Sequence, residues 1–325
     1  MNLPTYQDVI DASGRLKGRA IETPLLESAR MNERLGCRLL IKPECLQVTG
    51  SFKFRGAFNK LSKLSAEERA KGVVAYSSGN HAQGVACAAQ ILGIHATIVM
   101  PADAPRIKIA NTKSYGADVV TYDRKDGNRV AIAEAIAAET GGAIVPPYND
   151  PDIIAGQGTV GLELARQASE KDAHLDHVLA PCSGGGLISG CALAITETNP
   201  SANLYSVEPV GFDDTALSLE KGERVEIDVD RHSICDALLL ETPGEITFAL
   251  NKTLLSKGLV ITDDQALAAM RVAFQEFKIV LEPSGAVALA AILNNAIPIK
   301  GDTVAVVCTG GNVDADTFRS SLLDT

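Results

Sequence analysis

The 325-residue sequence lacks several features that mark particular classes of protein. It has no lysine- and arginine-rich run, and its formal net charge of −10 argues against a nucleic-acid-binding surface. Its apolar runs are far shorter than the roughly 20 residues that span a bilayer. The first residues carry no basic-then-apolar signal pattern, and no fixed-period repeat is present. These absences predict a globular protein that binds neither nucleic acid nor membrane.

Cysteine is present but not in pairs. The seven cysteines are scattered along the chain, an odd number with no Cys-x-x-Cys spacing. This pattern argues against a disulfide framework and against a structural zinc site. It fits a protein of the reducing cytoplasm.

The chain alternates short apolar strands with helices of 10 to 15 residues, which predicts an α/β fold with parallel sheets. We expect two open twisted sheets flanked by helices, because the length favours two units. A small mobile domain of residues 72–149 is predicted to be inserted into a large cofactor-binding domain of residues 1–71 and 150–325. Residues 5–35 predict a helix, a turn and a polar helix, whereas residues 213–258 give no clear pattern.

The segment Ser51–Gly56 places Lys53 between two phenylalanines at the predicted start of a helix. A desolvated lysine has a lowered pKa and can act as nucleophile or base, and the positive end of a helix acts in the same direction. From these residues alone, a solvated lysine in the first turn of an amphipathic helix remains an alternative.

Three apolar strands end in loops rich in glycine and hydroxyl groups, and parallel sheets bind ligands at such ends. The loop Ser183–Gly186 is the best phosphate site, since glycines admit a close ligand and free N–H groups at a helix start hold an anion. It matches neither a dinucleotide fingerprint nor a P-loop. A simple tight turn remains its alternative. A lysine of lowered pKa, a phosphate cradle and polar strand ends together suit pyridoxal phosphate, whose aldehyde bonds to lysine.

Five motifs in this order resemble the threonine dehydratase/serine racemase family, which are pyridoxal-phosphate enzymes of fold type II. The similarity runs from about residue 5 to residue 320 and is nearest to the bacterial threonine/serine ammonia-lyase branch. The motifs are Ser51–Ala57, Ser77–Gly84, Ala155–Thr159, Ser183–Leu187 and Thr309–Asn312.

The resemblance implies that Lys53 bonds to the cofactor aldehyde and that Ser78 faces it from the opposite side, so that both are catalytic. It implies that Asn80 contacts the 3-oxygen of the pyridine ring and Thr309 its nitrogen. The backbone N–H groups implied at the phosphate belong to Gly184, Gly185, Gly186 and Leu187. The residues implied around the substrate α-carboxylate are Ser77, Ser78, Gly79, Asn80 and His81.

A divalent metal site is also implied. Glu208, Asp214 and the carbonyl of Phe212 match metal-binding positions of the serine racemase branch, and oxygen ligands suit Mg²⁺, Ca²⁺ or Mn²⁺. On spacing alone, a solvated acidic loop is the alternative.

Some positions depart from the racemase pattern. Tyr76 and Tyr148 replace a histidine and an asparagine of serine racemases, and Ser183 replaces a glycine. Arg129 matches an arginine of the racemase and hydroxyaspartate branches, where it could pair with a second substrate carboxylate. A surface helix arginine is the alternative for Arg129.

The resulting hypothesis is an enzyme that eliminates water from L-threonine or L-serine and yields a 2-oxo acid and ammonia. Three alternatives stay open: a 3-hydroxyaspartate dehydratase, a serine racemase acting through Ser78, and a binding protein without catalysis. Homodimers are usual in the family, so we expect one here.

Overall fold

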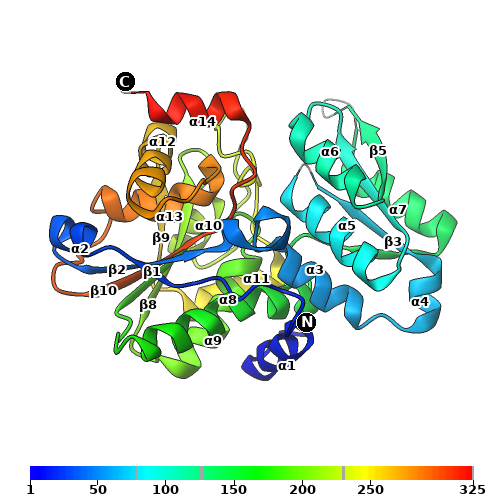
Figure 1. The fold of residues 1–325 in the computed structure, drawn as a ribbon. Coiled ribbons are helices and arrows are strands. Elements are labelled where there is room, and N and C mark those ends of the chain that lie inside the picture. The colour runs from blue at the N-terminus through cyan, green and yellow to red at the C-terminus, as the bar shows by residue number, and fades with distance from the viewer. Residues whose placement is uncertain (78, 124–126, 229–230, 324–325) are drawn as a thin grey trace.

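The computed structural model describes residues 1–77, 79–123, 127–228 and 231–323. Their strands form two sheets, which lie beside each other in Figure 1. The large sheet has the order β1-β2-β10-β7-β8-β9 and the small sheet the order β5-β4-β3-β6. The strands are β1 (Leu26–Glu27), β2 (Arg38–Pro43), β3 (Val73–Tyr76), β4 (Ala96–Pro101), β5 (Asp118–Tyr122), β6 (Ala143–Val145), β7 (His177–Pro181), β8 (Asn203–Pro209), β9 (Lys257–Ile261) and β10 (Thr303–Cys308).

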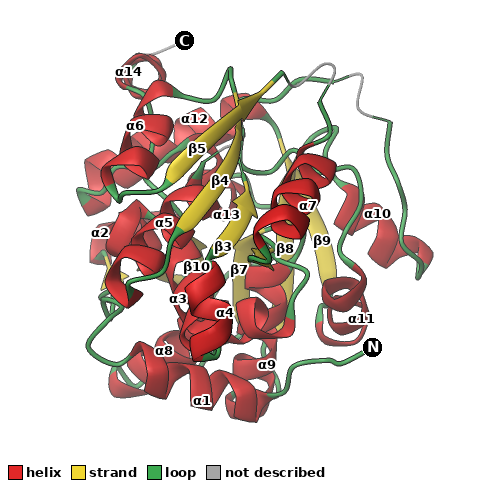
Figure 2. Ribbon diagram, turned by 90° about the vertical axis from the view of Figure 1, so that its right-hand side faces the viewer, coloured by secondary structure: helices red, strands yellow, loops and turns green. Residues whose placement is uncertain are grey.

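Helices cover both sheets (Figures 1 and 2). None of the described helices combines the length and apolar composition needed to cross a bilayer. The helices are α1 (Tyr6–Leu16), α2 (Ala29–Leu35), α3 (Lys53–Ser62), α4 (Ala66–Lys71), α5 (Asn80–Leu92), α6 (Arg106–Ser114), α7 (Arg129–Thr140), α8 (Pro151–Glu170), α9 (Gly186–Thr198), α10 (Asp214–Lys221), α11 (Glu245–Leu254), α12 (Asp263–Val272), α13 (Pro283–Leu293) and α14 (Ala315–Leu322).

The predicted α/β class with two sheets flanked by helices is confirmed. Every neighbouring pair of strands is parallel except β1 and β2. Two strands of the large sheet were not predicted. β1 has only two residues. β9 lies at the sheet edge with an interrupted burial pattern and begins at the end of the segment 213–258, which gives no clear pattern.

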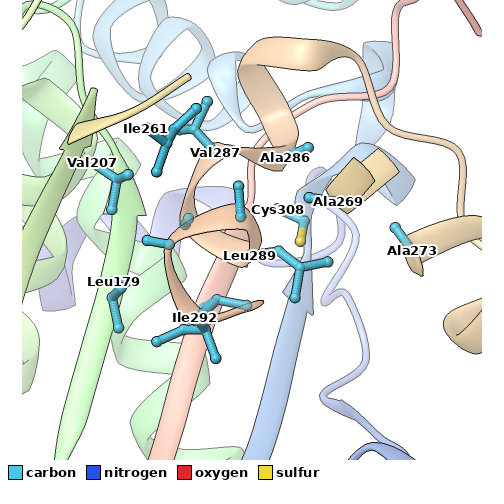
Figure 3. Close-up of a cluster of buried hydrophobic side chains, with 14 of the residues drawn as sticks. Leu179, Val207, Ile261, Ala269, Ala273, Ala286, Val287, Leu289, Ile292 and Cys308 are labelled. Atoms are coloured by element: carbon cyan, nitrogen blue, oxygen red, sulfur yellow. The ribbon is translucent and has the colours of Figure 1, made fainter. Parts of the chain in front are cut away.

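The large sheet packs against α13, a helix buried on all sides. Its residues Pro283–Ile292 are all buried, which is why it is apolar around its whole circumference. Figure 3 shows α13 between Leu179 of β7 and Val207 of β8 on one side and Ala269 of α12 on the other. This packing places the start of α13 at the carboxyl end of the sheet.

The small sheet has its own two faces. Val73 and Ala75 of β3 share a core with α5, whereas Val74 packs with Ala133 of α7 on the opposite face (Figure 2). Phe54 and Phe58 of α3 belong to the α5 core as well, so α3 contributes to the packing of the small sheet. The division at residues 71/72 and 149/150 and the mobility of the smaller part stay predictions.

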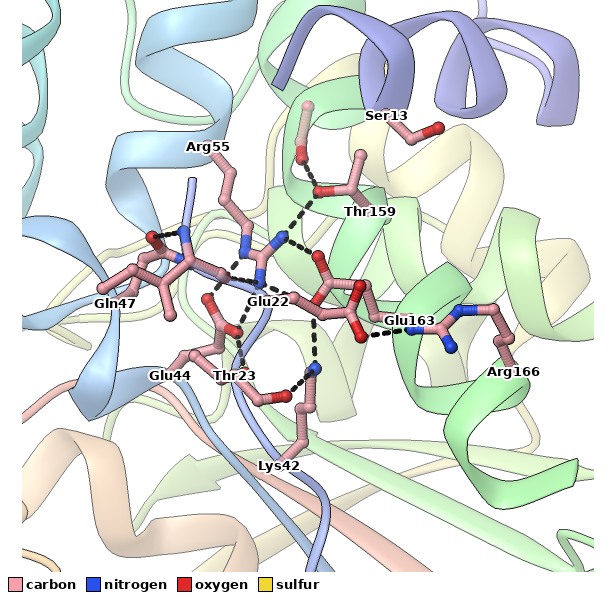
Figure 4. Close-up of polar contacts among 12 residues, drawn as sticks. Ser13, Glu22, Thr23, Lys42, Glu44, Gln47, Arg55, Thr159, Glu163 and Arg166 are labelled. Atoms are coloured by element: carbon pink, nitrogen blue, oxygen red, sulfur yellow. Dashed lines mark hydrogen bonds and ion pairs between the residues drawn. The ribbon is translucent and has the colours of Figure 1, made fainter. Parts of the chain in front are cut away.

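A buried ion network fixes α3 from its other side (Figure 4). The guanidinium of Arg55 donates to Glu44, to Glu163 and, at 3.2 Å, to the hydroxyl of Thr159. Glu163 also pairs with the ammonium of Lys42 at 2.7 Å. Because Arg55 lies two residues after Lys53, this network fixes the helix start that carries the lysine.

Candidate active site

A cavity lies at the carboxyl ends of strands from both sheets. The strands β3, β7 and β10 end at it through Tyr76, Pro181 and Thr309. It brings together every described residue predicted to contact the cofactor or substrate. These are Lys53, Ser77, Gly79, Asn80, His81, Arg129, Gly184, Gly185, Gly186, Leu187 and Thr309. Ser78 lies outside the described residues.

Lys53 is the first residue of α3, as predicted. Its Nζ donates to the carbonyl of Pro147 at 2.8 Å and lies 5.2 Å from the centre of the Phe52 ring. Desolvation by burial lowers the pKa of Lys53 to about 8. About a tenth of this amine is therefore neutral at pH 7, far more than for an ordinary lysine, and this neutral form can act as nucleophile or base.

Thr309 and the start of α3 are joined through the backbone. The carbonyl of Thr309 accepts the N–H of Phe52 at 3.2 Å, and Ser51 forms an antiparallel bridge with Gly310. These contacts hold Lys53 close to the end of β10. Thr309 is 5% exposed and lines the cavity.

The glycine loop turns directly into α9, whose first residue is Gly186. Gly185 has φ +90°, a left-handed conformation that favours glycine. A Cβ atom at Gly184 would lie 2.3 Å from the ring of Tyr148, so no larger residue fits there. The first N–H groups of a helix have no partner within it, and the loop can present them to an anion.

Asn80, the first residue of α5, links the two sheets. Its side-chain oxygen accepts from Asn312 Nδ2 at 2.8 Å, and its Nδ2 donates to Glu282. Glu282 precedes α13, and Asn312 follows β10. Asn80 is thus oriented by two residues from segments that adjoin β10 and α13.

The loop before α5 is fixed by hydrogen bonds at the start of the helix. The hydroxyl of Ser77 accepts the N–H of Gly79 at 3.1 Å. His81 bonds through Nε2 to the carbonyl of Val145 at 2.9 Å. Burial, with the Lys53 charge acting in the same direction, lowers the pKa of His81 to about 3, so the ring is neutral.

Arg129 is the first residue of α7, which Asn128 caps by accepting two backbone N–H groups. The arginine is half-buried and lines the cavity together with Tyr76 and Tyr148. Burial raises the pKa of both tyrosines, and the Arg129 charge acts against this shift. This part of the cavity lining therefore carries the guanidinium of Arg129 and the two neutral phenols of Tyr76 and Tyr148.

The predicted metal residues lie outside the cavity lining, where β8 ends and α10 begins. Glu208 accepts the N–H groups of Thr215 and Ala216 at 3.1 and 2.8 Å. Asp214 is fully buried, and neither of its oxygens has a hydrogen-bond partner among the described residues.

Both carboxyl groups have raised pKa values. Burial and then the Asp214 charge raise the pKa of Glu208 well above its usual range, and burial raises that of Asp214 to about 8. No cluster of three or more His, Cys, Asp or Glu side chains placed for a metal occurs within the described ranges. A cation here would have to combine these two carboxylates with carbonyl or water oxygens.

Three charged residues of the cavity lining were not among the site residues predicted from the sequence: Lys108, Asp236 and Glu282. The first is one of several basic residues around α6, and Asp236 lies in the segment whose pattern was unclear. Glu282 directly precedes Pro283 at the start of α13, a position that does not by itself distinguish it from any residue before a helix.

A cavity that combines a lysine of lowered pKa with a glycine loop at the ends of parallel strands is typical of cofactor-dependent α/β enzymes. The sequence profile described as "Pyridoxal-phosphate dependent enzyme" matches residues 17–310. The chain belongs to this family of pyridoxal-phosphate dependent enzymes.

Individual relatives agree with this placement. The chain is 42% identical over 320 residues to L-threo-3-hydroxyaspartate ammonia-lyase of Saccharomyces cerevisiae, covering 98% of this chain and 97% of that protein. It is 39% identical to the serine racemase of Schizosaccharomyces pombe, over 98% of each chain. Among solved structures, a T.th. threonine deaminase is similar with a TM-score of 0.89 and 42% identity, covering 96% of this chain and 99% of that one.

The residues present fit the cofactor. Lys53 supplies an amine of lowered pKa, and the glycine loop lines the same cavity with backbone that carries no side chain. In addition, the buried Nδ2 of Asn251 has no partner among the described residues and lies 2.9 Å from where a Cβ of Gly185 would be. The lysine, the glycine loop, Asn80 and Thr309 all meet in one cavity.

Proposed function

We propose that the protein eliminates water from a β-hydroxy amino acid and releases a 2-oxo acid and ammonia. The observation that carries the proposal is Lys53, with its pKa lowered to about 8, in the cavity that also holds the glycine loop. The names of the relatives support it, since they include ammonia-lyases and a deaminase of hydroxy amino acids.

In this proposal Lys53 bonds to the cofactor, Gly184–Leu187 hold its phosphate by backbone N–H groups, and Asn80 and Thr309 contact its ring. When bound, pyridoxal phosphate supplies an electron sink for the substrate Cα. The neutral amine of Lys53 removes the Cα proton, and a base with a pKa near the operating pH suits this step. The Cβ–oxygen bond breaks and the hydroxyl takes up a proton, so that overall the Cα proton and the β-hydroxyl leave as water. The enamine product then hydrolyses to a 2-oxo acid and ammonia.

The substrate α-carboxylate binds the loop at the start of α5. Ser77, Gly79 and Asn80 precede or begin that helix, whose partial positive charge favours an anion. The neutral His81 beside them leaves this region without an additional titrating charge near pH 7. The substrate is thus held with its Cα toward Lys53.

A dicarboxylic substrate is a second candidate, and Arg129 favours it. This half-buried guanidinium has no carboxylate partner among the described residues, and L-threonine and L-serine offer it none, whereas the second carboxylate of 3-hydroxyaspartate would pair with it. Relatives from Saccharomyces cerevisiae and Pseudomonas act, by name, on L-threo-3-hydroxyaspartate.

A panel of L-threonine, L-serine and the 3-hydroxyaspartate isomers, read out as 2-oxo acid, tests these substrates. Arg129→Met should reduce kcat/KM for hydroxyaspartate about 100-fold, the loss expected for a charge-assisted carboxylate contact, with little change for serine. The control is Arg106→Met. Arg106 is an exposed arginine that is the first residue of α6, as Arg129 is the first residue of α7. Equal losses for both substrates would argue against a second-carboxylate site.

The proposal includes a divalent cation, Mg²⁺ or else Ca²⁺ or Mn²⁺, held by Glu208, Asp214 and the carbonyl of Phe212. Its support is the pair of buried carboxylates, since two like charges in a low-dielectric site require a cation or protonation. The cation would fix the end of β8 and the start of α10.

We also propose a cytoplasmic homodimer. All seven cysteines are unpaired, which fits a reducing compartment. Phe274 and Val280, six residues apart, are large apolar side chains exposed by 40% and 42% and would be covered in a dimer. Light scattering at micromolar concentration gives the mass, and a monomer would remove this part of the proposal.

Lys53→Ala tests the reaction as a whole. It should remove both the visible absorbance of the bound cofactor and the activity, whereas Lys63→Ala, in the turn after α3, should keep both. Activity in the Lys53→Ala enzyme would refute the assignment.

A further inference from the structure

Lys108 of α6 is a buried ammonium group at the junction of the two sheets. Its Nζ lies 2.7 Å from Asp236 Oδ2 and 3.2 Å from Glu282 Oε2, and its side chain is 2% exposed. α6 packs with the small sheet, whereas Glu282 immediately precedes α13 of the large sheet and Asp236 lies between α10 and α11. Lys108 therefore joins the two parts of the molecule by ion pairs.

The same side chain supports the loop before α5. A Cβ atom at Gly79 would lie 2.6 Å from Lys108 Cδ and 3.2 Å from Nζ, so the lysine runs directly beneath the glycine. Asn80, the next residue, donates to the other oxygen of Glu282. Lys108 and Asn80, both on helices that pack with the small sheet, thus contact the same carboxylate, that of Glu282, which precedes α13 of the large sheet.

The charge of Lys108 is stable. The carboxylates of Glu282 and Asp236 outweigh the cost of burial and raise the pKa of Lys108 above its usual range. The side chain is consequently a cation near neutral pH and not a second base. Removing it would leave Glu282, which is 2% exposed, without an ion-pair partner among the described residues.

We propose that Lys108 is a positioning residue that closes the small-sheet part onto Asp236 and Glu282 and so sets Ser77, Gly79 and Asn80 for the substrate. The inference rests on the proposed function in that these residues bind the substrate carboxylate. Closure of this kind removes water from the cavity and completes the substrate contacts. Without the ion pairs the open form gains population, and apparent substrate affinity falls with the competent fraction.

The test compares Lys108→Met with Lys113→Met, which removes an exposed lysine from the same helix. Both holoenzymes are measured for cofactor absorbance, for KM and kcat, and for hydrogen exchange in peptides of α5 and α6. Lys108→Met should raise KM about tenfold or more, a coupling of ordinary size, while kcat falls less. Its α5 and α6 amides should exchange faster without substrate, whereas Lys113→Met should match the wild type.

Asp236→Asn separates positioning from direct substrate binding and carries the test if Lys108→Met does not fold. It retains the Lys108–Glu282 pair, so we expect a smaller rise in KM in the same direction. If Lys108 instead bound the substrate directly, loss of its competitor Asp236 would lower KM and overturn the proposal. Wild-type exchange and KM in Lys108→Met would overturn it as well. Because hydrogen exchange does not depend on turnover, failure of the proposed reaction would be recognised separately.

Discussion

The guanidinium of Arg55 forms a two-bond ion pair with Glu44, with Nε 2.7 Å from Oε2 and Nη2 2.8 Å from Oε1. Both side chains are at most 1% exposed. Such a fork-to-fork arrangement fixes direction as well as distance. It anchors the first turn of α3 and hence the backbone of Lys53.

Removing one partner of this pair should destabilise the protein strongly. Arg55→Met leaves Glu44 buried without its cation, and breaking a buried pair in this way costs about 3–5 kcal/mol. Urea unfolding of the cofactor-free protein measures the change. Arg30→Met, which removes the exposed partner of Glu276, is the control and should leave the midpoint nearly unchanged. A similar small effect for both variants would show that the buried pair contributes little.

Cofactor uptake should depend on the protonation of Lys53. Only the neutral amine attacks an aldehyde, and the pKa of Lys53 is lowered from 10.5 to about 8 by burial. The rate at which the cofactor-free protein gains visible absorbance should therefore rise about tenfold per pH unit below 8 and level off above it. Stopped-flow mixing with pyridoxal phosphate between pH 6 and 10 measures this. A rate that continues to rise to pH 10 would show an ordinary lysine.

A divalent cation should stabilise the site at Asp214. In the wild type, Mg²⁺ at 100 times its Kd should add about 2.7 kcal/mol and raise Tm by several degrees above the EDTA-treated protein. Asp214→Asn should abolish this rise because the buried carboxylate is lost.

The matched control is Asp213→Asn, since Asp213 accepts the N–H of Gly211 and an amide oxygen preserves that bond. It should keep the response to Mg²⁺. An equal rise in Tm for wild type and Asp214→Asn would place the cation elsewhere.

The crossing of α8 and α9 should tolerate no side chain at Gly190. A Cβ there would lie 2.3 Å from the carbonyl of Ile154 and 2.6 Å from the N of Gly158. Gly190→Ala should cost about 1–3 kcal/mol or more through overpacking, and because α9 carries the glycine loop it should also weaken cofactor binding.

Gly14→Ala, in α1, has no atom within 4 Å of the new Cβ and is the comparison. Replacing a helix-interior glycine at an open site should raise stability by about 0.5–1 kcal/mol. Thermal denaturation of both variants distinguishes them, and a neutral Gly190→Ala would show that the helices can separate at no cost.

Local sequence patterns predicted the parts of the site that lie on strand ends. The site residues in question each follow or begin an element whose apolar pattern is clear: Lys53, the Ser183–Gly186 loop and Thr309. Such positions are expected to meet in one site, because parallel sheets bind ligands at the carboxyl ends of their strands. Lys108 and Glu282 could not be found in this way. They are far apart in the sequence, and neither has a local pattern that distinguishes it from an ordinary helix or loop residue. Their importance comes from burial and from each other, which only the tertiary structure shows.

The position of β10 has a consequence for how the chain is made. This strand, Thr303–Cys308, lies in the middle of the large sheet, between β2 and β7, and Thr309 then bonds to the backbone of Phe52. A nascent chain on the ribosome has already produced β2, β7, β8 and β9 before the strand that joins them exists. The large sheet, and with it the pocket around Lys53, can therefore form only late in synthesis, whereas the small sheet can fold earlier as a local unit.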